Sequence, residues 1–396
     1  MSNNWSVPET EVVQRARERI EGGGGGDVLA TIVAVTGNAY RRPGAKMLLD
    51  PEGGGVGAIT PGCLEDELVK AAESVRERGR PELVTYDLME DDEDSVWGLG
   101  VGCNGRFDVL LEPLDGGYAP AVEALDNGRD IGVLTVVDGA GPLELGDRAY
   151  VHPADLRLVV AADAGATNGD DDAEAADWPE SLVAPAAELA RSGKADTVTV
   201  ETAAGPVSVF VDGMAAPPEL LVFGTGHDVG PVTELAAKND FRVTVVGFRG
   251  AVDLAERFPA ADETVTMSAR DVGSDLDLTD RTYAVVMTHN FLDDQFAVEA
   301  LLDAGVPYVG LMGPNERFEE MLEAFEEQGV SFDDDALEAL YTPIGLDLGG
   351  GSPYQIAHSI VAEAMAVSND RDPGHLRERE GHIHDRIDAD ADLPAQ

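Results

Sequence analysis

The sequence predicts an α/β protein in two parts: a β-rich mixed N-terminal domain over residues 1–216 and a Rossmann-like, doubly wound parallel sheet over residues 217–369. Strand-like apolar runs dominate the first part, whereas after Pro217-Pro218 such runs alternate with helical segments, as parallel sheets require. The first run after this boundary ends in Gly224-Thr-Gly226 and leads into a helical segment. Residues 370–396 are charged and lack an apolar period, which predicts a disordered tail.

The N-terminal part is expected to begin with a helix from Glu9 to Glu21, because Ser6 and Glu9 match a capping box. A second helix is expected from Leu64 to Arg78, where apolar residues recur at helical spacing. The acidic stretch 163–180 is interpreted as a solvated insertion. Apolar and β-branched runs predict strands at 28–35, 47–49, 56–59, 83–88, 107–111, 131–137, 156–161, 198–201 and 207–211.

In the C-terminal part the same reasoning predicts alternating elements. Strands are expected at 219–223, 242–246, 283–287 and 308–311, and helices at 228–239, 293–303 and 316–327. A final helix is expected to begin at Ser352-Pro353, because Ser352 and Gln355 match a capping box and proline suits the first helical position.

The charge of the chain limits its partners. Its 396 residues include 27 Lys and Arg against 76 Asp and Glu, a formal net charge of −49, and only four of the cations are lysines. Such acidity argues against nucleic acid and anionic membranes as partners. No apolar run is long enough to span a bilayer and no secretory signal is visible. We therefore expect the cytoplasmic protein of a halophile, and a homodimer on the general frequency of such oligomers.

Three cations stand close together at Arg41, Arg42 and Lys46. Guanidinium and ammonium groups suit a phosphate or another oxyanion, so this segment is a candidate anion site. The alternative is a structural cluster that pairs with nearby acids, which are abundant in this chain.

The two cysteines, Cys63 and Cys103, exclude a disulfide framework and a zinc site made only of cysteines. Cys63 follows Gly62 at the start of the predicted helix, where the helix dipole favours a thiolate. Cys103 follows Gly102 in a loop of four glycines that could let a ligand approach the backbone. The alternatives are a small buried hydrophobe for Cys63 and a tight strand connection for Cys103.

The segment Gly224-Thr-Gly226-His227 has the strand–turn–helix context of a nucleotide-binding turn. Its spacing is G-x-G-x-x-x-G, and the acid that would hold a ribose is missing because the second strand ends in Gly247. NAD binding is therefore weakly supported, while Arg249 could meet a phosphate. His289 and Asp347 follow later strands and are candidate binding residues at the same edge of the sheet, although each could equally be structural.

Taken in order, these elements resemble the xanthine dehydrogenase accessory factor family, XdhC/CoxI, over roughly residues 9–368. The sequence departs from the family pattern at Asn104, at Thr60-Pro61 and at Gly247. The elements that carry the resemblance are Y-R-x-x-G-A-x-M at 40–47, G-C-L-E at 62–65, the Gly-Cys loop at 102–106, G-x-G-H at 224–227, T-H at 288–289, G-L-x-G at 310–313 and P-I-G-L-D at 343–347.

The resemblance implies a protein that binds molybdenum cofactor, protects it, supports its sulfuration and inserts it into a xanthine-dehydrogenase-like or CO-dehydrogenase-like hydroxylase. Cys63 and Cys103 would then face molybdenum or sulfur, as metal ligands or catalytic thiols, and a cysteine desulfurase is a possible second partner. We expect the cofactor between the two domains and no turnover by this chain itself. The alternatives are an NAD(P)-linked oxidoreductase and a regulatory nucleotide-binding module.

Overall fold

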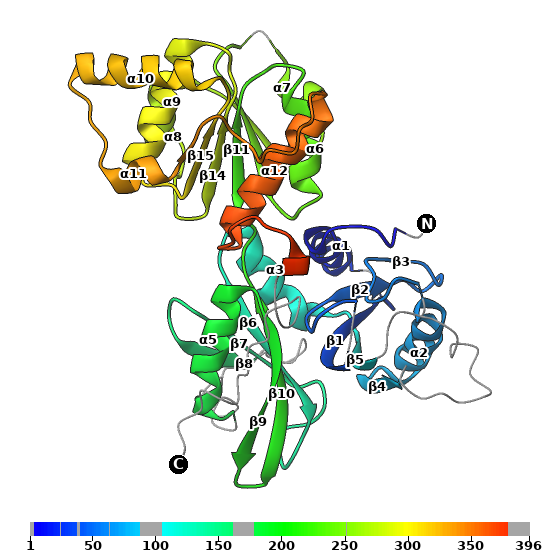
Figure 1. Ribbon diagram of the computed structural model, residues 1–396. Coiled ribbons are helices and arrows are strands. Elements are labelled where there is room, and N and C mark those ends of the chain that lie inside the picture. The colour runs from blue at the N-terminus through cyan, green and yellow to red at the C-terminus, as the bar shows by residue number, and fades with distance from the viewer. Residues whose placement is uncertain are drawn as a thin grey trace. The chain divides into compact units, whose positions relative to one another are not determined.

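The computed structural model describes residues 4–23, 25–37, 40–62, 64–87, 105–160, 178–250 and 252–378. These residues form two compact units, one ending at Ala216 and the other beginning at Pro217 (Figure 1). Within the described ranges, every helix is too short or too polar to cross a bilayer.

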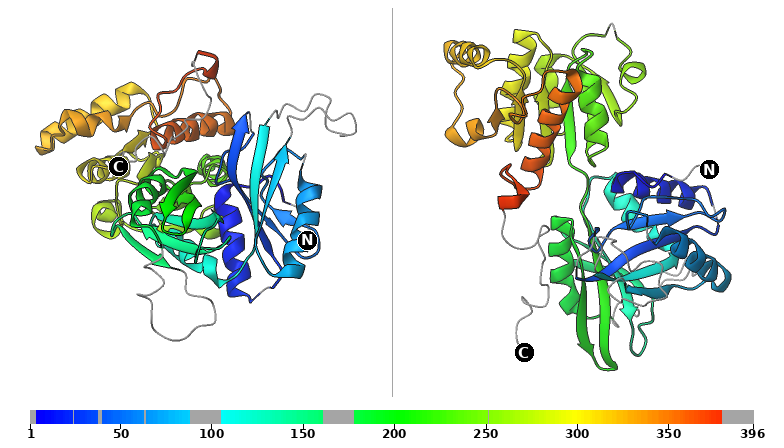
Figure 2. Two further views of the ribbon diagram at one scale, coloured as in Figure 1. Left: turned by 90° about the horizontal axis from the view of Figure 1, so that it is seen from below. Right: turned by 45° about the vertical axis from the view of Figure 1, so that its right-hand side comes forward.

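The first unit contains two five-stranded sheets, both antiparallel between all neighbouring strands (Figures 1 and 2). The first sheet has the order β3-β2-β1-β5-β4 and the second the order β8-β7-β6-β10-β9. The strands of the first sheet are β1 (Val28–Gly37), β2 (Lys46–Leu49), β3 (Gly55–Val56), β4 (Glu82–Asp87) and β5 (Gly105–Pro113). Those of the second are β6 (Ile131–Asp138), β7 (Arg148–His152), β8 (Arg157–Val160), β9 (Ala195–Thr202) and β10 (Gly205–Met214).

Helices bury the faces of these sheets. Leu68, Ala72 and Val75, at helical spacing on one side of α2, pack into the core of the first sheet. Ala186 and Leu189 of α5 do the same for the second sheet. The helical elements of this unit are α1 (Glu9–Glu21), α2 (Glu65–Arg78), η1 (Gly116–Tyr118), α3 (Ala119–Asp126), η3 (Glu180–Leu182) and α5 (Val183–Ser192).

The second unit is a six-stranded parallel sheet with the order β13-β12-β11-β14-β15-β16. Its strands are β11 (Glu219–Phe223), β12 (Arg242–Gly247), β13 (Glu263–Thr266), β14 (Thr282–Val286), β15 (Tyr308–Leu311) and β16 (Leu340–Tyr341). Its helical elements are α6 (Val229–Ala237), α7 (Leu254–Arg257), η4 (Ala269–Asp271), α8 (Val272–Asp275), α9 (Phe291–Asp303), α10 (Asn315–Gln328), α11 (Asp334–Glu338), α12 (Pro353–Ser368) and η5 (Leu376–Glu378).

Both faces of this sheet are buried, which explains why its strands are apolar throughout. Leu220 and Val222 of β11 point into the core shared with α6 and α12, whereas Leu221 and Phe223 point into the core shared with α9 and α10. Figure 1 shows α6 and α12 on one side of the strands and α8 to α10 on the other. The predicted mixed α/β class, with a Rossmann-like parallel sheet, is confirmed.

The structure corrects the predicted cap of the first helix. α1 begins at Glu9 as predicted, but its N-cap is Pro8 and no side chain caps it, so the predicted capping box at Ser6 is wrong. The capping box of α12 is present, with Ser352 as N-cap and Gln355 as its partner. The expected tail begins at residue 370: residues 370–378 are described and include η5, whereas 379–396 lie outside the described residues.

Candidate functional site

The carboxyl ends of β11 and β14 mark a change of direction in the parallel sheet. β12 and β13 lie on one side of β11, and β14 to β16 lie on the other, so the chain switches sides between β11 and β14. In open α/β sheets, ligands bind in the crevice outside such a switch point. The Gly224–Gly226 turn follows β11 here, and the Thr288–Asn290 loop follows β14.

Both glycines of this turn lie close to neighbouring atoms. Gly224 has φ +157°, and a Cβ built there would lie 2.8 Å from the Met287 carbonyl oxygen. A Cβ on Gly226 would lie 2.2 Å from Asp228 Oδ1. Gly224 therefore lets the end of β11 lie against the backbone of Met287, the residue that precedes Thr288, and Gly226 leaves room for the Asp228 carboxylate.

His289 and Asp228 join the two loops across the switch point. His289 Nε2 lies 2.9 Å from Asp228 Oδ2, and the imidazole is 60% exposed. The backbone of His289 has φ +61°, in the left-handed region that residues other than glycine seldom occupy. Asp228 precedes α6, so its carboxylate lies where the helix dipole favours negative charge.

A buried carboxylate fixes the loop that carries His289. Asp294 is 1% exposed and accepts hydrogen bonds from Thr288 Oγ1 and from Arg317 Nη2, each at 2.5 Å. The Arg317 guanidinium also lies 5.6 Å from the Phe291 ring centroid. Asp294 thus ties the loop after β14 to the start of α10.

Basic side chains surround the carboxyl end of β12. Arg249 follows this strand and its side chain is 69% exposed, with Nη2 at 3.8 Å from Asp293 Oδ2. Arg257, at the end of α7, has its Nη2 3.4 Å from His227 Nε2. The predicted residues Gly224, Gly226, His227, Arg249 and His289 therefore all lie at the same edge of one sheet.

Asp347 lies apart from these contacts. It is exposed in the loop between β16 and α12, and the described residues show no hydrogen bond or ion pair to its carboxylate. The loop itself is fixed by its neighbours, since Gly345 N donates to Glu363 Oε2 at 2.8 Å.

In the first unit, the predicted cationic segment is largely paired with acids of the same unit. Arg41 forms an ion pair with Glu9, and Lys46 Nζ lies 2.6 Å from Asp212 Oδ2. Arg42 is exposed. These contacts agree with the structural alternative for Arg41 and Lys46, while anion binding by the segment stays a prediction.

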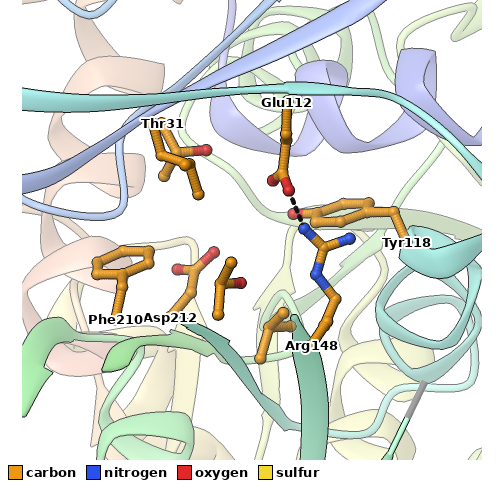
Figure 3. A pocket seen from close by; sticks show the side chains of 9 residues that line it. Thr31, Glu112, Tyr118, Arg148, Phe210 and Asp212 are labelled. Carbon is orange, nitrogen blue, oxygen red and sulfur yellow. Dashed lines mark hydrogen bonds and ion pairs between the residues drawn. The ribbon is translucent and has the colours of Figure 1, made fainter. Parts of the chain in front are cut away.

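Two buried ion pairs cross between the two sheets of this unit. Lys46 on β2 pairs with Asp212 on β10, and Glu112 on β5 pairs with Arg148 on β7 (Figure 3 shows the second pair). The Arg148 guanidinium also lies 5.4 Å from the centre of the Tyr118 ring. The cavity between these side chains measures about 10 Å³, room for about one water molecule, so no organic cofactor fits there.

Burial sets the direction of the pKa shift for Glu112, Tyr118 and Tyr150, whereas neighbouring charges set it for Lys46. It raises the pKa of Glu112 although Arg148 opposes the shift, and it raises the pKa of Tyr118 although Lys46 opposes it. The pKa of Tyr150 rises to about 12 for the same reason. For Lys46, burial lowers the pKa, but the nearby Asp212, Tyr118 and Glu112 outweigh it and the net direction is upward.

Three predicted residues lie outside the described residues: Cys63, Gly102 and Cys103. Gly62 is described, with φ +116° and open space around its Cα. Nearby, Thr60 Oγ1 donates to Glu65 Oε1 at 2.8 Å. Among the side chains that the structure does describe, no group of three or more His, Cys, Asp or Glu could hold a metal ion.

Sequence reasoning missed the residues that support the site. Asp228 and Asp294 had no distinguishing pattern in a chain with 76 acidic residues. Glu112 and Asp212 did leave a signal, because each is an acid inside an otherwise apolar strand run.

Comparison with protein families gives two matches along the chain. The model of the XdhC and CoxI family matches residues 24–87, and the model of the XdhC Rossmann domain matches residues 220–364. The second match contains the glycine turn, His289 and Arg249.

Individual proteins agree with these matches. A Bacillus subtilis protein named as a probable xanthine dehydrogenase subunit is 27% identical over 342 residues, which are 85% of this chain and 92% of that protein. An uncharacterised Escherichia coli protein, YqeB, is 27% identical over 197 residues, 49% of this chain and 35% of that protein. A crystal structure described as a xanthine dehydrogenase from Bacillus halodurans is similar with a TM-score of 0.68 and 26% identity, over 91% of this chain and 96% of that chain.

Proposed function

Because this chain belongs to the XdhC and CoxI family, we propose that it serves the maturation of a xanthine-dehydrogenase-like molybdenum hydroxylase. In this proposal the chain binds molybdenum cofactor, protects it, supports its sulfuration and delivers it to the apoenzyme. The Bacillus subtilis relative, which carries the name of a probable xanthine dehydrogenase subunit, supports the choice of client.

One observation carries the binding role: the Gly224–Gly226 turn and the His289 loop meet at the switch point, where open α/β sheets bind their ligands. A side chain at Gly224 would collide with the Met287 backbone, and one at Gly226 would displace the Asp228 carboxylate. Gly230, in the first turn of α6, has no atom within 4 Å of a built Cβ, so the start of this helix borders open space. Backbone N–H groups at a helix start suit the phosphate of an anionic cofactor.

The chain's own residues would bind and orient the cofactor. The Asp228 carboxylate repels an anion at the start of α6, but His289 Nε2 lies 2.9 Å away and offsets that charge when protonated. Asp294 keeps the His289 loop in place through Thr288. When bound, the cofactor supplies the molybdenum centre that the client enzyme uses.

The roles of Cys63 and Cys103 toward molybdenum or sulfur stay predictions, as do a cysteine desulfurase partner and a homodimer. The thiols can be tested by replacing each with serine and measuring cofactor retention. Unchanged retention in the single and double variants would remove them from the mechanism.

The test of the proposal is cofactor binding by the whole chain. Protein purified without oxygen is assayed for molybdenum by elemental analysis and for pterin by its fluorescent oxidation product. Near-stoichiometric amounts of both support the proposal, and Gly230→Leu should lower them because its side chain would extend into the open space beside the turn. Gly374→Leu, at a site equally open but in the C-terminal segment, is the matched control.

An NAD(P)-linked oxidoreductase remains the second candidate, because Arg249 lies exposed at the end of β12 where a 2′-phosphate could be bound. Absence of pterin after loading with excess cofactor, together with saturable NADP⁺ binding, would replace the first proposal with this one.

A further inference from the structure

The basic side chains at the end of β12 are not explained by the glycine turn. His227, Arg249 and Arg257 come from three separate segments: the turn after β11, the loop after β12 and the end of α7. Arg249 reaches solvent, and Arg257 lies against His227 at 3.4 Å. In a chain where acids outnumber Lys and Arg by 76 to 27, this concentration of positive charge needs a cause.

The three segments pack against one another at Gly247, the last residue of β12. A Cβ built on Gly247 would lie 3.0 Å from Leu254 Cδ1 on α7 and 3.1 Å from Thr225 Cγ2 in the turn. Each basic residue lies two or three positions after a residue that takes part in these contacts. His227 follows Thr225, Arg249 follows Gly247 and Arg257 follows Leu254. All three therefore surround the same end of the strand.

The same contacts leave little room for a side chain at residue 247. A dinucleotide fold that binds an unmodified ribose uses an acid near the end of the second strand to accept the ribose hydroxyls. An acid at residue 247 would need Leu254 and Thr225 to shift by a few tenths of an ångström. The chain offers glycine there, followed two residues later by arginine.

The nearby acids leave the arginines accessible. Asp253 Oδ1 accepts the Glu256 backbone N–H at 3.1 Å as the cap of α7, and Asp228 pairs with His289. Asp293 lies 3.8 Å from Arg249, in a long and partly exposed pair of the kind that contributes little. An incoming phosphate can therefore displace Asp293 from Arg249.

We propose that His227, Arg249 and Arg257 form a phosphate-monoester subsite, the β12 subsite, which binds the phosphorylated end of a ligand held at the switch point of the sheet. Guanidinium groups bind a phosphate through two parallel hydrogen bonds, which a ribose diol cannot replace. The phosphate can come from the pterin cofactor, in which case the inference rests on the proposed function, or from the 2′-position of a dinucleotide.

Paired ligands test the subsite on the whole chain at one fixed salt concentration. The fluorescent oxidised pterin is compared with its dephosphorylated form, and NADP⁺ with NAD⁺, by titration. We expect the phosphorylated member of at least one pair to bind about tenfold more tightly or better. Arg249→Gln and Arg257→Gln should each remove about tenfold of that preference and leave the affinity of the unphosphorylated member unchanged.

Two further variants sharpen the test. Arg242→Gln makes the same charge change at the opposite end of β12, where Arg242 is exposed, and should have no effect. Asp293→Asn removes the competing carboxylate and should tighten the phosphorylated ligand severalfold.

The outcomes separate this inference from the proposed function. Equal affinity within both pairs, or an Arg242→Gln loss as large as that of Arg249→Gln, overturns the subsite. Tight pterin binding without dependence on its phosphate keeps the proposed function and rejects the subsite. A preference for NADP⁺ over NAD⁺ without any pterin binding keeps the subsite and rejects the cofactor proposal.

Discussion

At the scale of single residues, the crossed ion pairs of the first unit bear directly on how its two sheets meet. Lys46–Asp212 places its acid on the second sheet, and Glu112–Arg148 places its acid on the first. Sliding one sheet over the other would separate both pairs at once and leave four charges buried. We therefore interpret the pairs as a device that specifies sheet packing, a role that buried charges have in some proteins.

Replacing one partner of an ion pair should lower the free energy of unfolding far more than replacing both partners. Lys46→Met leaves Asp212 buried and unpaired, which we expect to lower the free energy of unfolding by about 3–5 kcal/mol. The double variant Lys46→Met/Asp212→Leu should regain most of that loss, because no charge is left without its partner. Chemical unfolding of the three proteins measures both values. A double variant no more stable than Lys46→Met would contradict this interpretation.

Glu219 gives a pH dependence with a definite sign. Burial raises its pKa above the ordinary value of 4.5, although Thr244 and Arg242 oppose the shift. The carboxyl thus binds its proton more tightly in the folded chain, so its penalty is absent below pH 4.5 and grows as pH rises through the folded-state pKa. Glu219→Gln keeps an acceptor for Thr244 Oγ1 and should be more stable than the natural chain at pH 7.

At pH 4, below the ordinary pKa of 4.5, most of the difference between Glu219→Gln and the natural chain should be gone, because the glutamate is then mostly neutral in both the folded and the unfolded states. Unfolding curves across this pH range at constant salt provide the measurement. An advantage of the variant that grows toward low pH would refute the assigned direction.

Residues of the candidate site were predictable where their position after a strand is enough to place them at the site. Gly224, His289 and Arg249 follow strands, and the ends of parallel strands meet at one edge. Asp294 and Arg317 were not predictable, because their meeting depends on how two loops fold back on each other. Lys46 shows the reverse case: its charge suggested a ligand, whereas β10 supplies Asp212 from 166 positions further along the chain.

At the scale of elements, two similar sequence signatures have different outcomes. Ser352 and Gln355 form a capping box at α12, where Ser352 N donates to Gln355 Oε1 at 3.1 Å. Ser6 and Glu9 have the same spacing, but α1 starts three residues after Ser6 and Pro8 takes the N-cap position. The box needs the serine itself to be the N-cap, and the local sequence did not reveal where the helix would begin.

This contrast predicts that replacing serine with alanine lowers the free energy of unfolding at one of the two helix starts and not at the other. Ser352→Ala should lower the free energy of unfolding of the second unit by about 1 kcal/mol, the usual cost of losing an N-cap. Ser6→Ala should change stability by less than about 0.5 kcal/mol, because its side chain caps nothing. Unfolding monitored separately for each unit compares the two. Equal losses would show that the helix starts are assigned wrongly.

Several of the elements that sequence reasoning missed have weak apolar contrast. α3 and α5 bury mostly alanines, which give little periodic signal. β13 has four residues, all partly or fully exposed, and β16 has only two. By contrast, β11, β12, β14 and β15 were predictable because both faces of a parallel sheet are buried and their strands are nearly continuous apolar runs.

At the scale of the whole molecule, the net charge of −49 should govern stability. Like charges repel one another more in the compact state than in the unfolded chain. Screening shortens the range of this repulsion from about 10 Å at 0.1 M salt to about 3 Å at 1 M. We therefore expect the thermal midpoints to rise by roughly 5 °C or more between these concentrations of KCl.

How the thermal midpoints depend on KCl concentration distinguishes two causes of the stabilisation. One is screening of the like charges, and the other is exclusion of the solute from the protein surface. Screening weakens progressively, so most of the gain should come below about 1 M, and further salt should add little. Exclusion of solute continues to act at higher concentration and needs no charge, so sucrose at equal osmolality measures its share. Midpoints that rise as much in sucrose as in KCl would assign the stabilisation to exclusion. Acidity would then have to be explained by solubility at high salt, since it would contribute no salt dependence to the fold.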